Sequence, residues 1–227
     1  SEPVAIIGIG CRLPGGCDTP HAFWQLLREG RSAVIPPPAD RWDAKAFEAS
    51  YPDEPGKMQS SLSGFLHQVD QFDPHFFGIA PREANAMDPQ QRMALESAWE
   101  ALEDAGIVPA DLSGSSTSVF IGIGINDYGR LQIPAQAEDR SLMDNYFIQG
   151  NALCITANRI SYALNLQGPS LAIDSACSSS MSALHTACQS LRNGDSTLAL
   201  VGGTNVILAP DNSVGLGKFL APDGLCK

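Results

Sequence analysis

Cys177 is the residue best suited to covalent chemistry, and it lies in the stretch DSACSSS at positions 174–180. The residues before this stretch, 170–173 (SLAI), are a short apolar run typical of a buried strand. The residues after it carry apolar side chains with a helical period, and Gly194 is a suitable helix end. The thiol is therefore predicted at a strand-to-helix turn, where unpaired backbone N–H groups and the positive end of the helix dipole meet.

This position favours a nucleophilic cysteine without completing its activation. The thiolate is the reactive form, and a free cysteine is only a few per cent ionised at neutral pH. A helix N-terminus stabilises an anion by roughly 0.3–1 kcal/mol, so Cys177 still needs a partner group. The same N–H groups could stabilise an oxyanion on a thioester bound beside the sulfur. The alternative is a structural role, because free cysteines are often buried as small hydrophobic side chains.

The composition indicates a globular protein whose main partner is neither nucleic acid nor membrane. The 227 residues suffice for one or two domains with a sizeable core, and the net charge of −11 disfavours binding to nucleic acid or an anionic membrane. No apolar run reaches the ~18 residues that a membrane span needs, and no signal peptide opens the chain. We therefore expect a cytoplasmic location.

The six cysteines are irregularly spaced and include no Cys-x-x-Cys pair that would suggest zinc. Cys177 and Cys188 would lie ~16 Å apart along one predicted helix, which is too far for a disulfide. We predict reduced thiols and no metal site.

Alternation of strand and helix patterns predicts a layered α/β domain with a largely parallel sheet. Besides the strand before Cys177, buried strands are expected at 4–10, at 118–124 and at 197–203, the last continuing through 205–208. The glycines at positions 8 and 10 lack the third glycine of a dinucleotide-binding turn, which excludes nucleotide binding there.

The clearest sequence signals for the start of a helix are at two prolines. One helix is expected to begin at Pro20 and another at Pro89, where Asp88 is a good N-cap and Gln91 is in position to bond back to it. A third helix is expected through 157–162. The stretch 126–144 is predicted as loop.

Residues 31–81 lack helical or strand periodicity and are rich in proline. Aromatic residues nevertheless persist through this stretch. Rings in a loop are typical of a segment that packs against something, so 31–81 is predicted as an irregular, packed excursion.

Several strings resemble one enzyme family. The stretch at 174–180 resembles the active-site signature of β-ketoacyl synthases, the condensing enzymes of polyketide and fatty-acid biosynthesis. Further strings of this family are CRLPGG at 11–16, DPQQR at 88–92 with WEALE at 99–103, and ANRISY at 157–162. The resemblance, which extends along nearly all of the chain, is to ketosynthase domains of modular polyketide synthases.

This resemblance implies a thiolase-like fold, in which two similar halves form α-β-α-β-α layers and the domain dimerises. Residues 1–227 would be the N-terminal half of this pseudo-duplicated fold, with 31–81 as an excursion within it. The ending at Lys227 fits a proteolytic nick, an artificial split or a naturally divided synthase. The implied partners are the C-terminal half, a second copy, an acyl carrier protein and neighbouring polyketide synthase domains.

The resemblance also implies an acyltransferase that extends acyl chains. Cys177 would receive the chain as a thioester from the phosphopantetheine arm of the carrier, and decarboxylative Claisen condensation with a malonyl-type extender would follow. The family's two histidines and lysine lie in its second half, so the chain alone would be incomplete. The chain itself is expected to bind no cofactor, and the Cys177 N–H is our candidate for one oxyanion donor.

Other residues receive predictions of lesser weight. On resemblance alone, Tyr146 and Asn151 are expected to border the acyl pocket. His185 is excluded as a base because it would lie ~12 Å along the helix axis from Cys177, and it is predicted to be a packing residue. Arg159 is unusual in an apolar helix and could bond across an interface.

Two further functions stay open. A ketosynthase that lacks a catalytic histidine would accept and pass on acyl chains without elongating them. A half-domain without catalysis would serve as a dimerisation or carrier-docking module. The sequence specifies neither the acyl substrate nor the extender.

Overall fold

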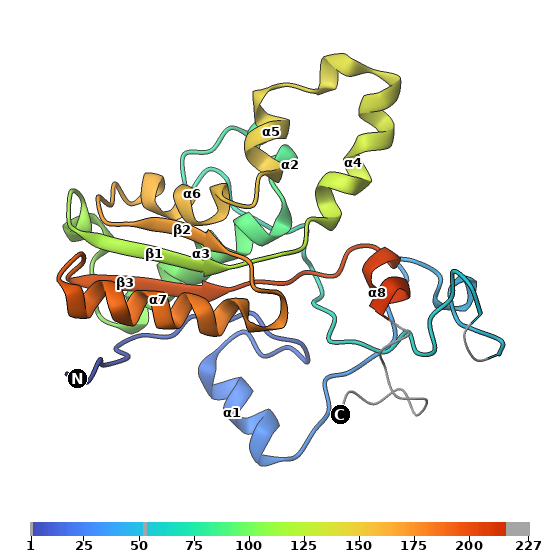
Figure 1. Ribbon diagram of the computed structural model, residues 1–227, viewed down its shortest axis with the longest axis horizontal. Helices are drawn as coiled ribbons and strands as arrows, with labels where there is room; N and C mark the ends of the chain where they lie inside the picture. Colours follow the sequence, from blue (N-terminus) through green and yellow to red (C-terminus); the bar gives the residue numbers. More distant parts are fainter. Residues whose placement is uncertain (1, 52–53, 217–227) are drawn as a thin grey trace. The chain divides into compact units, whose positions relative to one another are not determined.

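The computed structural model describes residues 2–51 and 54–216 (Figure 1). It forms two compact units, one made of Ser1–Cys11 with Val69–Val206 and the other of Arg12–Gln68 with Ile207–Lys227. The first unit contains the sheet and Cys177. Cys226 and the chain's end at Lys227 lie outside the described residues.

The centre of the first unit is a three-stranded parallel sheet with the order β2-β1-β3. The strands are β1 (Thr117–Gly122), β2 (Ser170–Ile173) and β3 (Leu198–Gly203). These three predicted strands are confirmed, but only β1 is buried along its whole length. The prediction of full burial was wrong for β2 and β3, because each is an edge of the described sheet.

Helices cover both faces of this sheet, as Figure 1 shows. The helices concerned are α3 (Pro89–Asp104), α6 (Ile155–Ala163) and α7 (Ser179–Asn193). Val119 and Ile121 of β1 pack into a core with α3 and α6, whereas Phe120 packs against Ala187 of α7. Because successive side chains of a strand point to opposite faces, β1 joins two cores into three layers.

The other described elements are shorter. In the first unit they are α2 (Pro81–Ala86), η2 (Pro109–Leu112), α4 (Asp127–Glu138), η3 (Arg140–Leu142), α5 (Asn145–Asn151) and η4 (Ala176–Ser178). In the second unit they are α1 (Pro20–Arg28), η1 (Ala44–Ala46) and α8 (Asp211–Leu216). The predicted start of α1 is confirmed, with Thr19 accepting a hydrogen bond from the Ala22 N–H at 3.1 Å.

The start of α3 is buried and polar. Asp88 caps it as predicted, accepting a hydrogen bond from the Gln90 N–H at 2.8 Å. Burial raises the pKa of the Asp88 carboxyl above its ordinary 3.8, although the hydrogen bonds from Gln90 oppose this shift. The predicted bond from Gln91 back to the cap is absent, because its side-chain amide donates instead to carbonyls at the end of α5. The spacing of Asp88 and Gln91 allowed the local bond, but the packing of α5 against α3 offered Gln91 other acceptors.

The segment 4–10 is not a strand, which corrects the prediction. It is extended, and Val4, Ile6, Ile7 and Ile9 are exposed. Its anchor is the Ile9 N–H, which donates to Asp104 of α3 at 2.8 Å. A β-branched run forms a strand only where a neighbouring strand accepts its backbone hydrogen bonds, and the described residues supply none here.

Two further predictions were wrong around the sheet. The stretch 126–144, predicted as loop, contains α4 and η3; Asn126 caps α4 by accepting from the Gly129 N–H at 2.7 Å. Pro134 and Gly129 within α4 obscure its helical pattern. Residues 205–208 do not continue β3, because the chain leaves the ladder after Gly203 and the Val206 N–H bonds to a side chain of α3.

Several aromatic residues of 31–81 pack against other rings within their own unit, whereas Tyr51 is exposed. In the first unit, Phe76 and Phe77 lie edge-to-face on Trp99 of α3, with ring centroids 4.9 and 6.1 Å away. In the second unit, Trp42 and Phe65 lie 5.4 Å apart. Such pairs stabilise irregular backbone that has few ladder hydrogen bonds of its own.

Candidate active site

Cys177 lies at the carboxyl end of the parallel strands. β2 ends at Ile173, η4 carries the cysteine, and α7 begins at Ser179. The predicted strand-to-helix turn is therefore present, and its thiol is exposed and free. In parallel α/β sheets, ligands bind outside the carboxyl ends of the strands, where successive connections diverge to opposite faces. Here α6, which leads into β2, and α7, which leads into β3, pack on opposite faces of β1.

Serine hydroxyls hold this turn together. The buried Ser179 hydroxyl accepts from the Ser175 N–H at 2.9 Å and donates to the Ala176 carbonyl at 2.7 Å. Ser178 donates to the Ser175 carbonyl at 2.8 Å, and the hydroxyls of Ser175 and Ser182 lie 2.8 Å apart. The many serines around Cys177 thus satisfy backbone groups that a tight turn leaves unpaired.

Ala176, directly before the cysteine, has a left-handed backbone with φ of +56°. This conformation is unfavourable for a residue with a Cβ atom, so surrounding contacts must maintain it. Among the described residues no acceptor is found for the Cys177 N–H. That donor is consequently available to an oxygen atom bound beside the sulfur.

Glycines at the strand ends let the turn approach the sheet. A Cβ atom at Gly122 would lie 2.6 Å from both the Ser179 carbonyl carbon and the Ser180 nitrogen. A Cβ at Gly124 would lie 2.7 Å from an Asp174 carboxylate oxygen, and one at Gly203 would lie 2.7 Å from the Ser180 Cβ. The ends of β1 and β3 therefore set the position of the first turn of α7.

The other two predicted site residues lie on α5. Tyr146 is half-buried, with the Arg82 guanidinium 5.9 Å from its ring centre. Asn151 donates to the Phe147 carbonyl at 2.9 Å. In the part of the chain that the structure describes, neither side chain has a hydrogen bond or ring contact with Cys177. The place of Tyr146 and Asn151 beside the acyl pocket stays a prediction.

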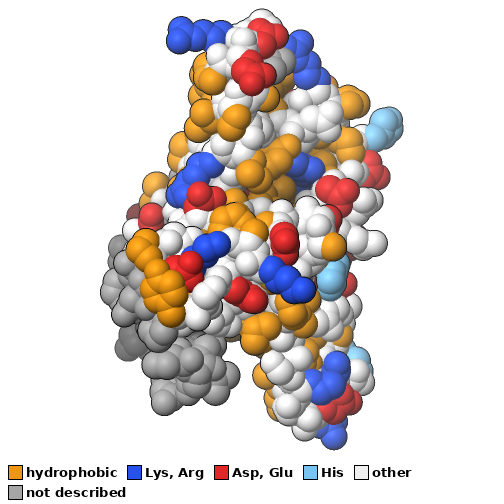
Figure 2. Space-filling model, turned by 90° about the vertical axis from the view of Figure 1, so that its right-hand side faces the viewer, with side chains coloured by type: hydrophobic (Ala, Val, Ile, Leu, Met, Phe, Trp, Pro, Cys, Tyr) orange, Lys and Arg blue, Asp and Glu red, His pale blue; other side chains and the backbone are white. Residues whose placement is uncertain are grey.

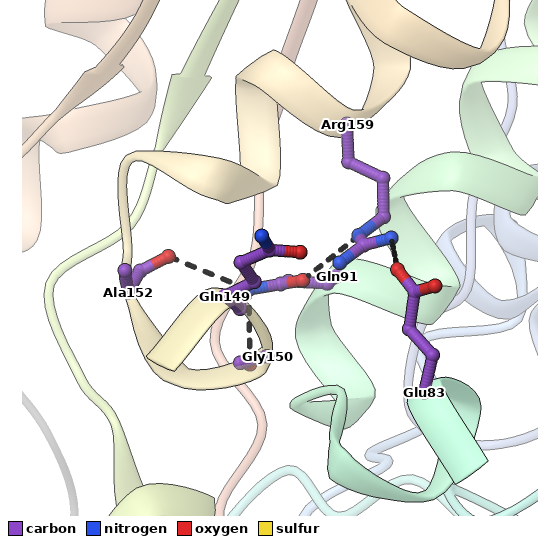
Figure 3. Close-up of polar contacts among 6 residues, drawn as sticks. All are labelled: Glu83, Gln91, Gln149, Gly150, Ala152 and Arg159. Carbon is purple, nitrogen blue, oxygen red and sulfur yellow. Dashed lines mark hydrogen bonds and ion pairs between the residues drawn. The ribbon is translucent and has the colours of Figure 1, made fainter. Parts of the chain in front are cut away.

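A polar network that was not predicted fixes the end of α5 (Figure 3). The Gln91 amide donates to the carbonyls of Gln149 and Gly150 at 3.0 and 2.9 Å. Its oxygen accepts from Arg159 at 3.1 Å, and the Arg159 guanidinium pairs with Glu83 of α2 at 2.6 Å. The network joins α2, α3, α5 and α6. The Arg159 guanidinium therefore bonds to Gln91 and Glu83 of its own chain, whereas a bond across an interface had been considered.

Breaking this network should destabilise the first unit. Arg159→Met is expected to lower the free energy of unfolding by about 2–3 kcal/mol, less than the ~3–5 kcal/mol typical of a fully buried pair, because the Glu83 side chain is 22% exposed. Urea unfolding measures this change. Arg82→Met is the matched control: Arg82 pairs with Asp144 but is 73% exposed, so the loss should stay below about 1 kcal/mol. Equal losses for the two variants would contradict the network's role.

His185 does not have the packing role that was predicted. Its side chain lies on an exposed position of α7. The helical period places His185 next to the apolar positions 184 and 188. Closeness to apolar positions along the helix did not bury the His185 side chain.

The network has no signature in the sequence, because its members are far apart in the chain and individually ordinary. One local signal for α5 was available: Asp144 precedes it and caps it, accepting from the Phe147 N–H at 3.0 Å. This hydrogen bond also lowers the pKa of the Asp144 carboxyl.

The surface carries charges of both signs. Figure 2 shows Lys and Arg side chains interspersed with Asp and Glu on the face it presents, with hydrophobic side chains between them. No helix among the described residues is both long and apolar enough to cross a bilayer. Nor do the described residues group three or more metal-ligating side chains at one place.

Comparison with known proteins matches the whole chain to one family. The family model described as "Beta-ketoacyl synthase, N-terminal domain" covers residues 1–227. One subunit of the phenolphthiocerol/phthiocerol polyketide synthase of Mycobacterium tuberculosis is 50% identical over 228 residues, spanning 100% of this chain and 15% of that protein. Another subunit of the same synthase is 48% identical over 236 residues, spanning 100% of this chain and 10% of its own length. The chain therefore corresponds to a small part of these relatives.

Solved structures give the same assignment. An oxazolomycin ketosynthase domain from Streptomyces albus has a TM-score of 0.86 and 38% identity, covering 94% of this chain and 37% of that chain. A ketosynthase from module 6 of the bacillaene synthase of Bacillus subtilis has a TM-score of 0.84 and 36% identity, covering 98% and 36%. These likenesses confirm the predicted thiolase-like α/β fold class.

Proposed function

The chain belongs to the β-ketoacyl synthase family, and from this premise we propose that it supplies the nucleophilic cysteine of a polyketide-type ketosynthase. Cys177 is that nucleophile, and its acyl substrate arrives on the phosphopantetheine arm of an acyl carrier protein. The observation that carries the proposal is the exposed thiol on a strained turn at the carboxyl end of a parallel sheet, beside an N–H that has no acceptor among the described residues.

The chemistry follows from this geometry. The Cys177 sulfur, as thiolate, forms a bond to the thioester carbonyl carbon, and an electron pair moves onto the oxygen. The Cys177 N–H donates to this oxyanion. When the intermediate collapses, the bond to the carrier sulfur breaks and the carrier leaves as a thiol, taking up the proton that Cys177 released. The acyl-enzyme then condenses with a malonyl-type extender, whose decarboxylation provides the carbanion.

Condensation requires groups beyond this chain. We propose that the C-terminal half of a ketosynthase supplies the histidines and the lysine. The exposed apolar segment with Val4, Ile6, Ile7 and Ile9 supports such a partner, since it has the composition of a buried strand without a neighbour among the described residues. The solved ketosynthases, of which this chain covers 37% and 36%, are consistent with the same division.

We also propose that a second copy of the domain binds to this one as a dimer partner. Tyr162 of α6 is 90% exposed and Leu171 of β2 is 50% exposed. These elements contact each other, and β2 is an edge strand of the described sheet with backbone groups open to pairing. The neighbouring domains of a polyketide synthase are further proposed partners. We propose no cofactor for the chain itself. The cytoplasmic location remains a prediction.

Tyr146 and Asn151 are proposed to border the acyl pocket. Support comes from the network that fixes the end of α5, since a rigid wall can discriminate between acyl chains. Tyr146→Ala is expected to shift the preference toward bulkier acyl groups by about tenfold, a change typical of one altered apolar contact. Competition between two acyl-carrier thioesters measures the preference. An unchanged ratio would argue against the pocket.

The proposed function is tested by loading and turnover. The chain, assembled with a ketosynthase C-terminal half, is mixed with an acyl-carrier thioester and then with malonyl carrier, and intact masses are recorded. Acylation at Cys177 followed by a product two carbons longer supports the ketosynthase proposal. Acylation without condensation indicates a transfer function, and absence of acylation indicates a scaffolding module.

A further inference from the structure

The Ser179 hydroxyl makes two hydrogen bonds that bracket the strained residue of the turn. It accepts from the Ser175 N–H at 2.9 Å on one side of Ala176 and donates to the Ala176 carbonyl at 2.7 Å on the other. The Ser179 backbone N–H also donates to the Ala176 carbonyl. This carbonyl is therefore held toward the start of α7 by two donors from one residue.

The direction of that carbonyl determines the direction of the next N–H. The peptide bond between Ala176 and Cys177 is trans, and in a planar trans peptide the C=O and N–H groups point in opposite directions. Holding the Ala176 oxygen toward α7 consequently aims the Cys177 N–H away from α7. This agrees with the lack of an acceptor for it among the described residues.

We propose that Ser179 is a positioning residue that orients the Cys177 N–H toward the oxyanion. The proposal rests on the proposed function, because an oxyanion forms only if Cys177 attacks a thioester. The hydroxyl of Ser179 bonds to Ser175 and Ala176, and among the described residues it has no hydrogen bond with the Cys177 sulfur, so we infer that it acts through the peptide plane between Ala176 and Cys177. The residue is 8% exposed, its single O–H donor is used by Ala176 and its oxygen accepts from Ser175, so water cannot easily replace it.

Two reactions of the same sulfur separate positioning from simple structural support. Acyl transfer from a carrier thioester passes through an oxyanion, whereas alkylation by iodoacetamide is a direct displacement at carbon and develops no oxyanion at the cysteine N–H. A residue that orients the N–H should matter for the first reaction and much less for the second. A residue that only stabilises the fold should affect both reactions alike.

The experiment compares Ser179→Ala with Ser190→Ala in the chain assembled with a ketosynthase C-terminal half. Ser190 is the matched control because it is also a buried serine of α7, 6% exposed, and its hydroxyl bonds to Ser196 at 2.9 Å. For Ser179→Ala we expect acyl loading about ten- to a hundredfold slower, as for two lost hydrogen bonds. Its alkylation rate should change less than about threefold, and Ser190→Ala should keep both rates near those of the unmodified protein.

Each other outcome overturns a defined statement. If the unmodified protein does not load acyl groups but is alkylated, the proposed function fails and the inference fails with it. If the unmodified protein loads and Ser179→Ala loads equally fast, only the inference on Ser179 is overturned. A parallel fall of loading and alkylation in Ser179→Ala also overturns it, because this pattern indicates a structural role.

Discussion

Cys177→Ala should abolish acyl loading, while Cys154→Ala should leave it unchanged. Both cysteines are exposed and lie near the N-terminus of a helix: Cys154 directly precedes α6, and Cys177 lies in η4, two residues before α7. They differ in the turn: Cys177 follows a left-handed residue, whereas Cys154 has the ordinary right-handed backbone with φ of −61°. The two thiols thus share exposure and a place near a helix N-terminus, and they differ in the conformation of the turn.

Intact-mass measurement after incubation with an acyl-carrier thioester checks this result. We expect one acyl group on the unmodified protein and on Cys154→Ala, and none on Cys177→Ala. Loading should be absent in Cys177→Ala because the covalent intermediate then has no sulfur at this position on which to form. An adduct that persists in Cys177→Ala and disappears in Cys154→Ala would transfer the proposed role to the other cysteine.

Gly122→Ala should damage the turn from the opposite side, through the sheet. The new Cβ atom would lie 2.6 Å from backbone atoms of Ser179 and Ser180, which cannot rotate away as a side chain can. We expect a loss of about 1–3 kcal/mol in the free energy of unfolding, as for an overpacked core. We also expect acyl loading to slow by up to ~100-fold, since displacing a reacting group by about 1 Å has effects of that order.

Gly202→Ala provides the matched control in the neighbouring strand. Its Cβ would meet only the terminal methyl of Ile121, at 3.1 Å, and that side chain can adjust. Both variants gain the same methyl group and the same strand propensity, so the difference between them reports the contact with α7. Urea unfolding and single-turnover acyl loading give the two measurements. Similar results for Gly122→Ala and Gly202→Ala would show that the glycine at 122 does not set the turn.

The sequence predicted the strands, helices and caps that are formed by residues close to one another in the chain. Local patterns identified the strand before the Cys177 turn, the helix after it, the Asp88 cap of α3 and the Thr19 cap of α1. The place of Cys177 at a strand-to-helix turn followed from the same patterns. Its catalytic role, like the pocket role of Tyr146 and Asn151, remains a proposal.

Features that depend on distant partners were not predicted. The segment 4–10 has the pattern of a strand but finds no ladder among the described residues, and Gln91 gives up a local cap for carbonyls 58 and 59 residues away. The φ of Ala176 likewise follows from Ser179 and the sheet behind it, since alanine itself disfavours that conformation. Sequence periodicity reports which side chains share a face, and it contains no information on which distant group will meet them.

Two ion pairs lie beside α5, and because they differ in exposure, the two ends of this helix should respond differently to salt. Arg82 and Asp144 meet near its beginning with the Arg82 side chain 73% exposed, whereas Arg159 and Glu83 act near its end with the Arg159 side chain only 9% exposed. Dissolved ions screen exposed charges far more than covered ones. Raising the ionic strength should therefore loosen the first turn of α5, around Tyr146, while the last turn stays anchored.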